Sequence, residues 1–366
     1  MPEHSESNGR RPTIRDVAQR AGVSKSLVSL VMRGQPMVRE DKRRRVYEAA
    51  EELGYQTPLL PRSLPVVRSR TVGVLIADLR NPLLVDVVDR AGQVLEDAGF
   101  SMVLASAVAP SGTASGQRLD LRAIGAFKGL RLEGLLVVGS VPERAALAEA
   151  VCATPMVVAA AAGEGLRADV VRNDDHLGMR LIVDYLVACG HRAIAHLGGL
   201  GGGTAQERVA GYRAAMEHHG LASEIVVADA DFTEDAGYRG AAQLLRRRRP
   251  VTAITAVNDL AAVGALSAAS DAGLRVPEDL AVTGYDDTFV AAIRQVSLTS
   301  VNPDSSGIGS LAARCLLKRI EATDLHPEEH LLPPRLVTRF SSSSGLNSPG
   351  RGTPFGEATD GPASGA

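Results

Sequence analysis

Short apolar runs alternate with amphipathic stretches between Thr71 and about Val301, and this pattern predicts strands and helices in turn. Eight runs predict buried strands: TVGVLIAD, GFSMVLASA, LEGLLVVG, PMVVAAA, AIAHLGG, EIVVADA, AITAVND and LAVTGYDD. Four stretches between them predict helices: NPLLVDVVDRAGQVLEDAG, DHLGMRLIVDYLVACG, ERVAGYRAAMEHHG and DLAAVGALSAASDAG. The alternation indicates parallel sheets with helices on both faces. The alternating region is about 230 residues long, which is more than one sheet usually takes, so we predict two α/β lobes. A ligand crevice should lie between them, at the carboxyl ends of the strands.

The segments outside this region follow other patterns. Compact helices are predicted over 13–54, and YQTPLLPRSLPVVRSR, with three prolines, predicts a linker. The Gly/Ser/Pro-rich end cannot bury a core and has no heptad repeat, which argues against an oligomerisation coil. We therefore expect five parts: a disordered tail at 1–11, a helical domain at 12–57, a hinge at 58–70, the two-lobed domain at 71–340 and a disordered tail at 341–366.

The helices before the linker have the spacing of a helix-turn-helix. Thr13 and Asp16 form a capping-box-like start, Gly22 ends the first helix, and Ser24 can cap a second helix, KSLVSLVMR. A third helix at about 41–53 packs back on this pair. An ordinary helical hairpin is the alternative that the spacing leaves open.

In a helix-turn-helix the amino-terminal residues of the second helix meet base edges in the major groove. The exposed side of this helix carries groups that can donate, accept or touch a thymine methyl. They are Lys25, Ser26, Ser29 and Leu30.

Charge is divided unevenly along the chain. Residues 11–70 carry 13 Lys/Arg and 6 Asp/Glu, a net charge of +7, whereas residues 71–366 carry 26 and 34, a net of −8. This asymmetry predicts that only the amino-terminal module meets a polyanion. Lys42–Arg45 either grips phosphate or forms a solvated helix face. The run Arg246–Arg249 lies near a predicted helix end, where cations complement the macrodipole, and we interpret it as structural.

Composition and motifs exclude several classes of protein. Cys152, Cys189 and Cys315 are too far apart for a disulfide framework or a CxxC motif. The polar amino terminus has no signal-peptide core, and no apolar stretch of about 18 residues occurs, so we expect a cytoplasmic protein without a membrane span. GGLGGG fails the phosphate-loop spacing, and the histidines form no HExxH. We expect no catalytic residue, no metal and no cofactor.

The segment TIRDVAQRAGVSKSLVSLVMRGQPMVREDKRRRVYEAAEELGYQTP resembles the DNA-binding module of the lactose-repressor (LacI/GalR) family of bacterial regulators. SRTVGVLIADLRNPLL, GLRLEGLLVVG, GHRAIAHLGG, RVAGYRAAM, TAITAVNDLAAVGAL, GLRVPEDLAVTGYDD and LVTRF continue the resemblance to about residue 340. It implies a small all-α helix-turn-helix domain followed by a periplasmic-binding-protein-like (type I) α/β effector domain of two lobes. It also implies a homodimer on a pseudo-palindromic double-stranded DNA operator, most often a repressor.

The resemblance also implies a hinge leucine inserted into the minor groove, and the matching residue is Leu64, beside Arg62. Such a wedge costs a few kcal/mol of unstacking, offset by contacts to the bent DNA. A linker residue packed on its own lobe is the alternative.

The DNA-contacting set we expect is Thr13, Ser24, Lys25, Ser26, Ser29, Leu30, Arg33, Arg62 and Leu64. Leu30, Leu27 and Arg33 depart from the usual family residues, so the operator half-site should differ. Pro58 and Pro61 impair the hinge helix if it begins before Pro58.

For the effector, the resemblance places contacts on loops after the strands. The matching residues are Asp78, Asn81, Thr204, Arg208, Phe232, Asn258 and Asp286. Arg208 offers a fork for a hydroxyl pair or a carboxylate, and the carboxylate and amide groups can hold sugar hydroxyls. A role as turn or cap residues without a ligand is the alternative for Asp78, Asn258 and Asp286. Leu83-Leu84 and Asn173 depart from the family pattern, so the cleft holds a sugar or related metabolite, another ligand, or none.

Two function classes remain. One is a regulator whose cleft senses a small molecule, and the other is a stand-alone solute-binding protein or enzyme on the same fold. A secreted binding protein needs an export signal and no basic module, and this sequence shows the reverse. We therefore expect a regulator whose ligand shifts the population between lobe arrangements.

The +7 module predicts steep salt dependence of operator binding. Six to ten phosphate contacts should lose about 10³–10⁵ in affinity between roughly 50 and 200 mM salt, because binding releases counterions. Fluorescence anisotropy with a selected operator measures this. Equal affinity at both salt concentrations would contradict the prediction.

Overall fold

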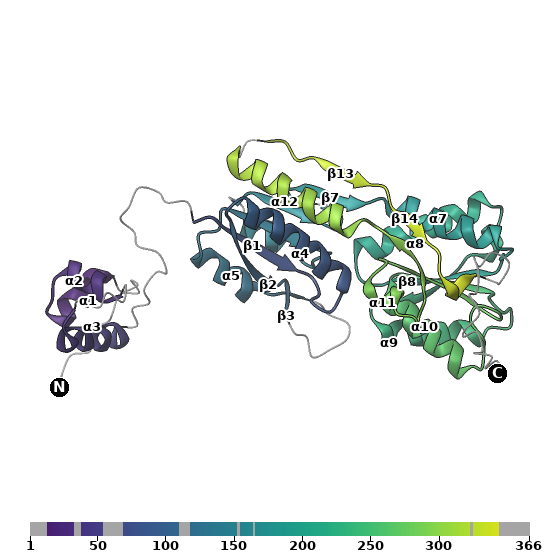
Figure 1. Cartoon of the computed structure of the whole chain (residues 1–366), viewed down its shortest axis with the longest axis horizontal. Helices are drawn as coiled ribbons and strands as arrows, with labels where there is room; N and C mark the ends of the chain where they lie inside the picture. Colours follow the sequence, from purple (N-terminus) through teal and green to yellow (C-terminus); the bar gives the residue numbers. More distant parts are fainter. Residues whose placement is uncertain are drawn as a thin grey trace, which may run out of the picture. The chain divides into compact units, whose positions relative to one another are not determined.

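The computed structural model describes residues 13–32, 38–53, 69–109, 118–151, 154–163, 165–322 and 325–343. The chain forms two compact units, Met1–Val67 and Arg68–Ala366 (Figure 1).

The described part of the amino-terminal unit consists of α1 (Ile14–Ala21), α2 (Lys25–Met32) and α3 (Glu40–Glu52). Gly22 follows α1 with a φ of 64°, the left-handed conformation that glycine adopts without strain, and turns the chain toward α2. The predicted helix-turn-helix spacing is confirmed. Its core is formed by small and β-branched side chains from all three helices, among them Val17, Val28 and Val46.

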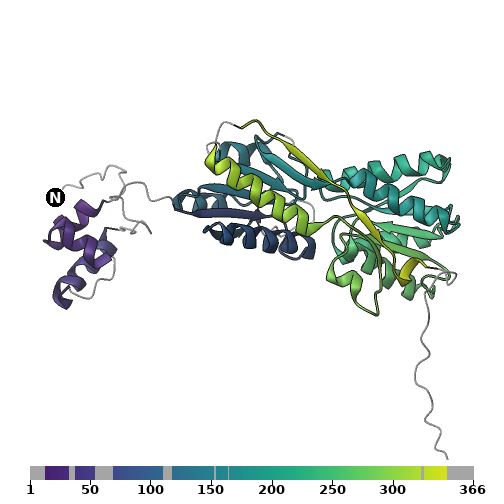
Figure 2. The same cartoon turned by 45° about the horizontal axis from the view of Figure 1, so that its top comes forward.

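The first lobe of the large unit contains a six-stranded sheet in the order β13-β7-β6-β5-β1-β2, with every neighbouring pair parallel. Its strands are β1 (Thr71–Ile76), β2 (Ser101–Ser106), β5 (Gly134–Val138), β6 (Met156–Ala159), β7 (Asp169–Asn173) and β13 (Glu329–Leu332). A short pair, β3 (Val108–Ala109) and β4 (Arg118–Leu119), lies beside it. One face packs on α4 (Pro82–Asp97) and α12 (Ser305–Glu321), which run side by side (Figure 2). The other face packs on α5 (Leu121–Gly129) and α6 (Arg144–Ala150).

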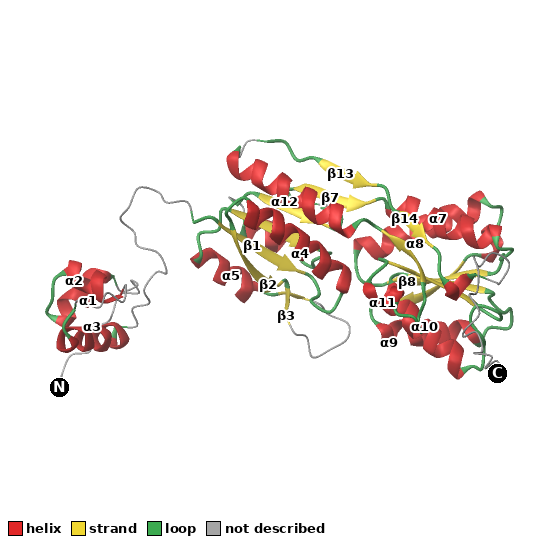
Figure 3. Ribbon diagram, in the orientation of Figure 1, coloured by secondary structure: helices red, strands yellow, loops and turns green. Residues whose placement is uncertain are grey.

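The second lobe contains a sheet in the order β14-β12-β11-β10-β8-β9, parallel except for the β12–β14 pair. Its strands are β8 (Ile194–Gly199), β9 (Val226–Ala230), β10 (Ala253–Ala256), β11 (Ala281–Tyr285), β12 (Thr299–Asn302) and β14 (Arg335–Val337). Its helices cover both faces: α7 (Asp175–Ala188) and α8 (Gly203–His218) on one, α9 (Glu234–Leu245) and α10 (Asp259–Asp271) on the other (Figure 3). Three short helical turns complete the lobe: η1 (Ala222–Glu224), α11 (Phe289–Ala292) and η2 (Phe340–Ser342).

The chain crosses between the lobes three times. It passes from β7 to α7, from β12 to α12, and from β13 to β14. The first lobe is therefore completed by α12 and β13, which follow strand β12 of the second lobe. The second lobe is completed by β14, which follows strand β13 of the first lobe.

The eight predicted strands and four predicted helices of the lobes are confirmed, as are parallel sheets with helices on both faces. Strands β7, β12, β13 and β14 were not predicted, because they are short and rich in polar residues. Helix α12 was not predicted either, because Gly307 and Gly309 lower its intrinsic helicity. Gly309 is needed there, since a Cβ at this position would overlap the carbonyl oxygen of Val87 in α4.

The described body extends through Ser343, beyond the expected boundary at residue 340. Ser341 and Ser342 are buried. The Ser341 hydroxyl donates to the Val282 carbonyl at 2.6 Å, and the Ser342 hydroxyl lies 2.6 Å from that of Thr299. These hydrogen bonds attach the end of the described chain to β11 and β12.

Two glycines allow α9 and α10 to pack closely. A Cβ on Gly264 would overlap the carbonyl oxygen of Glu234, and one on Gly237 would overlap that of Ala261. We expect Gly264→Ala to lower the free energy of unfolding by about 1–3 kcal/mol, because backbone atoms must move apart. Gly125→Ala in α5 is the control: its Cβ meets nothing within 4 Å, so it should be neutral or stabilising. Urea unfolding of both variants measures this, and equal effects would contradict it.

Candidate functional site

The exposed side of α2 carries the residues expected to read DNA. Lys25, Ser26 and Leu30 are exposed and Ser29 is half-buried, whereas Val28 and Val31 on the opposite side are buried. Ser24 caps the helix, since its Oγ accepts from the Leu27 N–H at 3.2 Å.

Thr13 supports α1 in the predicted manner. Its N–H and its hydroxyl both donate to Asp16 Oδ2 at 2.6 Å. Its contact with DNA stays a prediction. Arg33, Arg62 and Leu64 lie outside the described residues, as do Pro58 and Pro61.

The basic run at the start of α3 has mixed roles. Arg45 Nη2 donates to the Ala21 carbonyl at 2.8 Å and so holds α3 against the end of α1. Arg44 lies 3.9 Å from Glu48, one turn along the exposed face. Lys42 is exposed. The run therefore contributes packing as well as charge.

In the large unit, Arg208 is the centre of a buried polar cluster. It lies on α8 with 2% of its surface exposed. Its Nε donates to Asp175 Oδ1 at 2.9 Å, and its Nη1 donates to Asp286 Oδ1 at 3.1 Å and to the Val257 carbonyl. The guanidinium carbon lies 3.7 Å from the centre of the Tyr285 ring, over its face. Burial lowers the pKa of Arg208, but the two carboxylates outweigh it and raise the pKa, so the side chain stays charged.

The same cluster joins the two lobes. Asn173, the last residue of β7 in the first lobe, donates from Nδ2 to the Tyr285 hydroxyl at 2.8 Å and to Asp175 Oδ1 at 3.0 Å. Both partners belong to the second lobe. An Asp here would add a third carboxylate and lose both donors. Asn173, which departs from the family pattern, thus fits the charge of this cluster.

Burial changes the pKa values of Asp286 and of His196. It raises the pKa of Asp286 to about 7, although Arg208 acts in the opposite direction. It also lowers the pKa of His196 to about 3, so this fully buried imidazole is neutral. His196 Nδ1 lies 2.7 Å from Thr255 Oγ1. Asp286 has a φ of 102°, a strained conformation for a residue with a side chain. Strain and a raised pKa in one residue are typical of functional sites.

The other expected effector residues hold the ends of helices and loops. Asn81 caps α4 by accepting from the Leu83 N–H at 3.0 Å. Asn258 caps α10 by accepting from the Ala261 N–H at 2.9 Å, and its Nδ2 donates to the Phe232 carbonyl at 3.1 Å. Asp78 accepts from Arg80, through both its N–H and its guanidinium. Thr204 lies in the first turn of α8 and is half-buried.

The structure brings together four of the five residues expected from the second lobe: Arg208, Phe232, Asn258 and Asp286. The guanidinium carbon of Arg208 lies 6.0 Å from the centre of the Phe232 ring, and Val257 and Asn258 connect the two. From the first lobe, Ser140 approaches Gly202, the residue before α8: a Cβ on Gly202 would lie 2.7 Å from Ser140 Oγ. The facing ends of the lobes are therefore in contact here.

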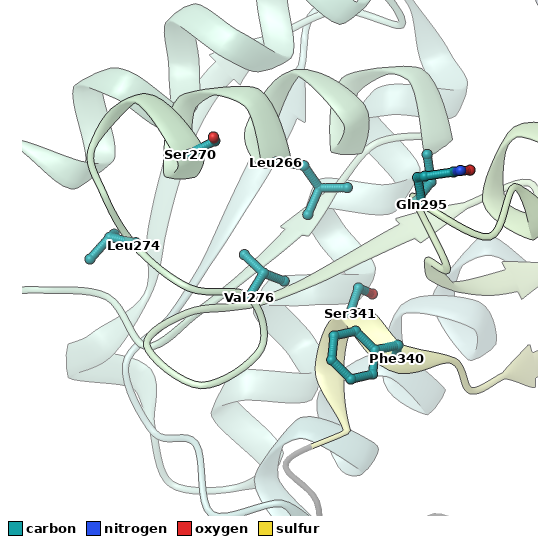
Figure 4. Close-up of a pocket in the computed structure, with 8 residues that line it drawn as sticks. Leu266, Ser270, Leu274, Val276, Gln295, Phe340 and Ser341 are labelled. Carbon is teal, nitrogen blue, oxygen red and sulfur yellow. The ribbon is translucent and has the colours of Figure 1, made fainter. Parts of the chain in front are cut away.

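Sequence reasoning missed Asp175 and Tyr285 as members of the cluster, and it missed the buried His196, whose pKa Arg208 helps to lower. The usable signal was a polar residue within or directly after an apolar strand, as in AIAHLGG and AVTGYDD. Two pockets lie elsewhere and have none of the expected effector residues in their walls. One, of about 280 Å³, is lined by residues such as Leu266, Val276 and Phe340 (Figure 4). The other, of about 240 Å³, lies in the first lobe beside Ile124 and Phe127.

Comparison with known proteins connects the helical unit and the lobes to one family. The model described as bacterial regulatory proteins, lacI family, matches residues 13–58, and a periplasmic binding protein-like domain matches residues 183–342. The HTH-type transcriptional repressor PurR of Proteus mirabilis is 31% identical over 340 residues, which cover 91% of this chain and 97% of the relative. The chain belongs to the LacI family. It is a DNA-binding transcriptional regulator with a ligand-binding domain, and not an enzyme.

Solved LacI-family structures share this architecture. The transcriptional regulator CelR in complex with cellobiose is 31% identical, with a TM-score of 0.65, and the match covers 91% of this chain and all of that one. The Lac repressor dimer bound to operator and the anti-inducer ONPF is 26% identical, with a TM-score of 0.66 over 91% and 99% of the two chains. Within the described residues, no helix is long and apolar enough to span a membrane, and no group of His, Cys, Asp and Glu could hold a metal ion.

Arg208 should carry much of the stability of the second lobe. Arg208→Met leaves two buried carboxylates without a cation and should cost about 3–5 kcal/mol of unfolding free energy. The loss should be smaller at pH 5 than at pH 8, because Asp286, whose pKa burial raises to about 7, is protonated at the lower pH and then needs no cation. Arg239→Met is the control, since its partner Asp235 is exposed and the pair should contribute about 0.5 kcal/mol or less. Urea unfolding at both pH values would refute the prediction if the two variants behaved alike.

Proposed function

We propose that this LacI-family chain is a dimeric repressor that binds a pseudo-palindromic operator and responds to a small molecule held between its lobes. The observation that carries the proposal is the exposed face of α2, where Lys25, Ser26, Ser29 and Leu30 stand together on a compact three-helix unit. Such a face can lie in a major groove, and a two-fold dimer would present two copies to two half-sites.

Exposed apolar side chains support the dimer. In the first lobe, Met102 and Leu104 stand exposed on the edge strand β2, and Val85 is exposed on α4 beside it. In the second lobe, Phe289 is 69% exposed and Ile293 is 41% exposed. Large apolar side chains that gather on one surface mark contact sites between proteins. The edge of β2 would also gain a cover in a dimer.

The buried cluster supports the effector site. Asp78, Asn81, Thr204, Arg208, Phe232, Asn258 and Asp286 are the residues we assign to it. Carboxylates beside a guanidinium offer both acceptors and donors, which suits a neutral molecule with several hydroxyls, such as a sugar or a related metabolite. The similar regulator CelR is solved with cellobiose, which is consistent with this class of ligand.

The mechanism follows from the junction of the lobes. A ligand that binds one lobe arrangement better than the other shifts the population toward it, by no more than the difference in affinity. Asn173 and its partners in the second lobe lie where this movement would occur. The shift would alter the spacing of the two DNA-binding units in the dimer and hence operator affinity.

Variants of α2 test operator recognition. An operator is first selected from randomised duplexes with the purified protein. Ser26→Ala and Leu30→Ala should each weaken binding to it by about 1–3 kcal/mol and leave binding to random duplexes nearly unchanged, because base contacts specify sequence. Arg239→Ala on the ligand-binding body is the control and should have no effect. If the α2 variants bind the selected operator as tightly as the wild type, the proposed reading surface is wrong.

A thermal-shift screen tests the effector site. The panel contains sugars, polyols, sugar phosphates, purines and pyrimidines. A ligand at about a hundred times its Kd should add about 2.7 kcal/mol, which is several degrees in Tm. Thr204→Val should reduce the shift by removing one hydroxyl while keeping the shape of the side chain, and Thr252→Val, at the other end of the strands, is its control. The assignment fails if a ligand shifts the wild type and both variants equally.

A further inference from the structure

A run of four arginines on the second lobe has no role in the proposed function. Helix α9 ends at Leu245, and Arg246–Arg249, called here the arginine loop, follows it directly. All four residues are exposed. The stabilising effect of cations at a helix end falls off within one turn, so it accounts for Arg246, the cap residue, and not for the three that follow.

Most of the charge in the arginine loop is not neutralised. Among the described residues, Arg249 has one acidic partner, Glu224, at 3.4 Å, and Arg246, Arg247 and Arg248 have none within 4.0 Å. Other arginines of this lobe are paired, as in Arg239 with Asp235 and Arg275 with Asp279. Adjacent like charges repel one another, and an anionic partner would relieve that repulsion.

The neighbouring loop adds another positive charge. Arg192 is exposed, and among the described residues its Nη1 donates to the carbonyls of Val187 and His191, both at 2.9 Å. Its loop is joined to the residues after the arginine loop, because the Thr252 N–H donates to the Ala193 carbonyl at 2.8 Å. Both loops precede parallel strands, so this surface lies at the opposite end of the sheet from Asn258 and Asp286.

We propose that the arginine loop and Arg192 form a docking surface for a short acidic segment, rich in Asp and Glu, of a partner protein. The guanidinium fork binds carboxylates through two parallel hydrogen bonds. Nucleic acid suits the surface less well. Four residues span at most about 14 Å, so a duplex would extend past the loop. Its phosphates would then meet a body whose net charge is −8 over residues 71–366, and a stiff duplex cannot bend away from this body as a flexible peptide can.

Fluorescence anisotropy of the full chain with labelled decaglutamate tests this surface, with decaglutamine as the uncharged peptide. Saturating unlabelled duplex occupies the amino-terminal unit, whose net charge of +7 over residues 11–70 would otherwise bind the same peptide. The double variant R247Q/R248Q should weaken decaglutamate binding about tenfold, because it removes two unpaired cations. R239Q/R275Q removes the same net charge from paired arginines of the same lobe and should change binding by less than about twofold. Binding should also weaken between about 20 and 150 mM salt. Thermal unfolding of both variants checks that the fold is retained.

Three results would overturn the proposal. Decaglutamate could bind no better than decaglutamine, which would show that the surface does not recognise carboxylates. Both double variants could weaken binding equally, which would show an effect of net charge alone. R247Q/R248Q could weaken binding of a non-operator duplex and not of the peptide, which would assign the surface to nucleic acid. None of these outcomes affects operator or effector binding, so failure here is distinct from failure of the proposed function.

Discussion

The buried ion pairs of Arg208 with Asp175 and Asp286 are the constraint on which the large unit depends. A guanidinium and two carboxyl groups are almost fully removed from water, which is tolerable only if each one finds partners. The partners come from β7, α7, β10 and β11 and the residues that follow them, so these elements must all be in place before the charges are satisfied. The cluster therefore fixes the relative positions of elements from both lobes.

The same constraint limits how a ligand can act. Two donor nitrogens of Arg208 are already occupied by protein oxygens. A ligand that contacts these two nitrogens must share them or displace one of their partners. Displacing a carboxylate from a buried arginine is costly. A carboxylate that stays in place can accept a further hydrogen bond from a ligand hydroxyl without this cost. The cluster thus favours ligands that add hydrogen bonds without adding charge.

Much of this architecture could be predicted from the sequence, and the reasons for the failures are physical. Long apolar strands such as β1 and β8 and the caps at Thr13 and Ser24 depend on local patterns, and the sequence displays them directly. Strands β13 and β14 have little pattern of their own, because each is an edge strand that forms only beside a completed sheet. Arg208 was identified, but its burial was not, since its two carboxylates lie 33 and 78 residues away. Residue type predicts which groups can bind, while tertiary contacts decide which of them are already occupied.

The three crossings between the lobes determine the order in which the protein can be completed during synthesis. The first lobe receives α12 and β13 only after the strands β8 to β12 of the second lobe have been made. The second lobe receives β14 later still, and its last buried serines are residues 341 and 342. Neither lobe can close its core on the ribosome as an independent unit. An incomplete chain that ends before β13 would expose the edge of β7. A chain that also lacks α12 would expose the sheet face that this helix covers. The fold thus requires nearly the whole chain before either half is protected from aggregation.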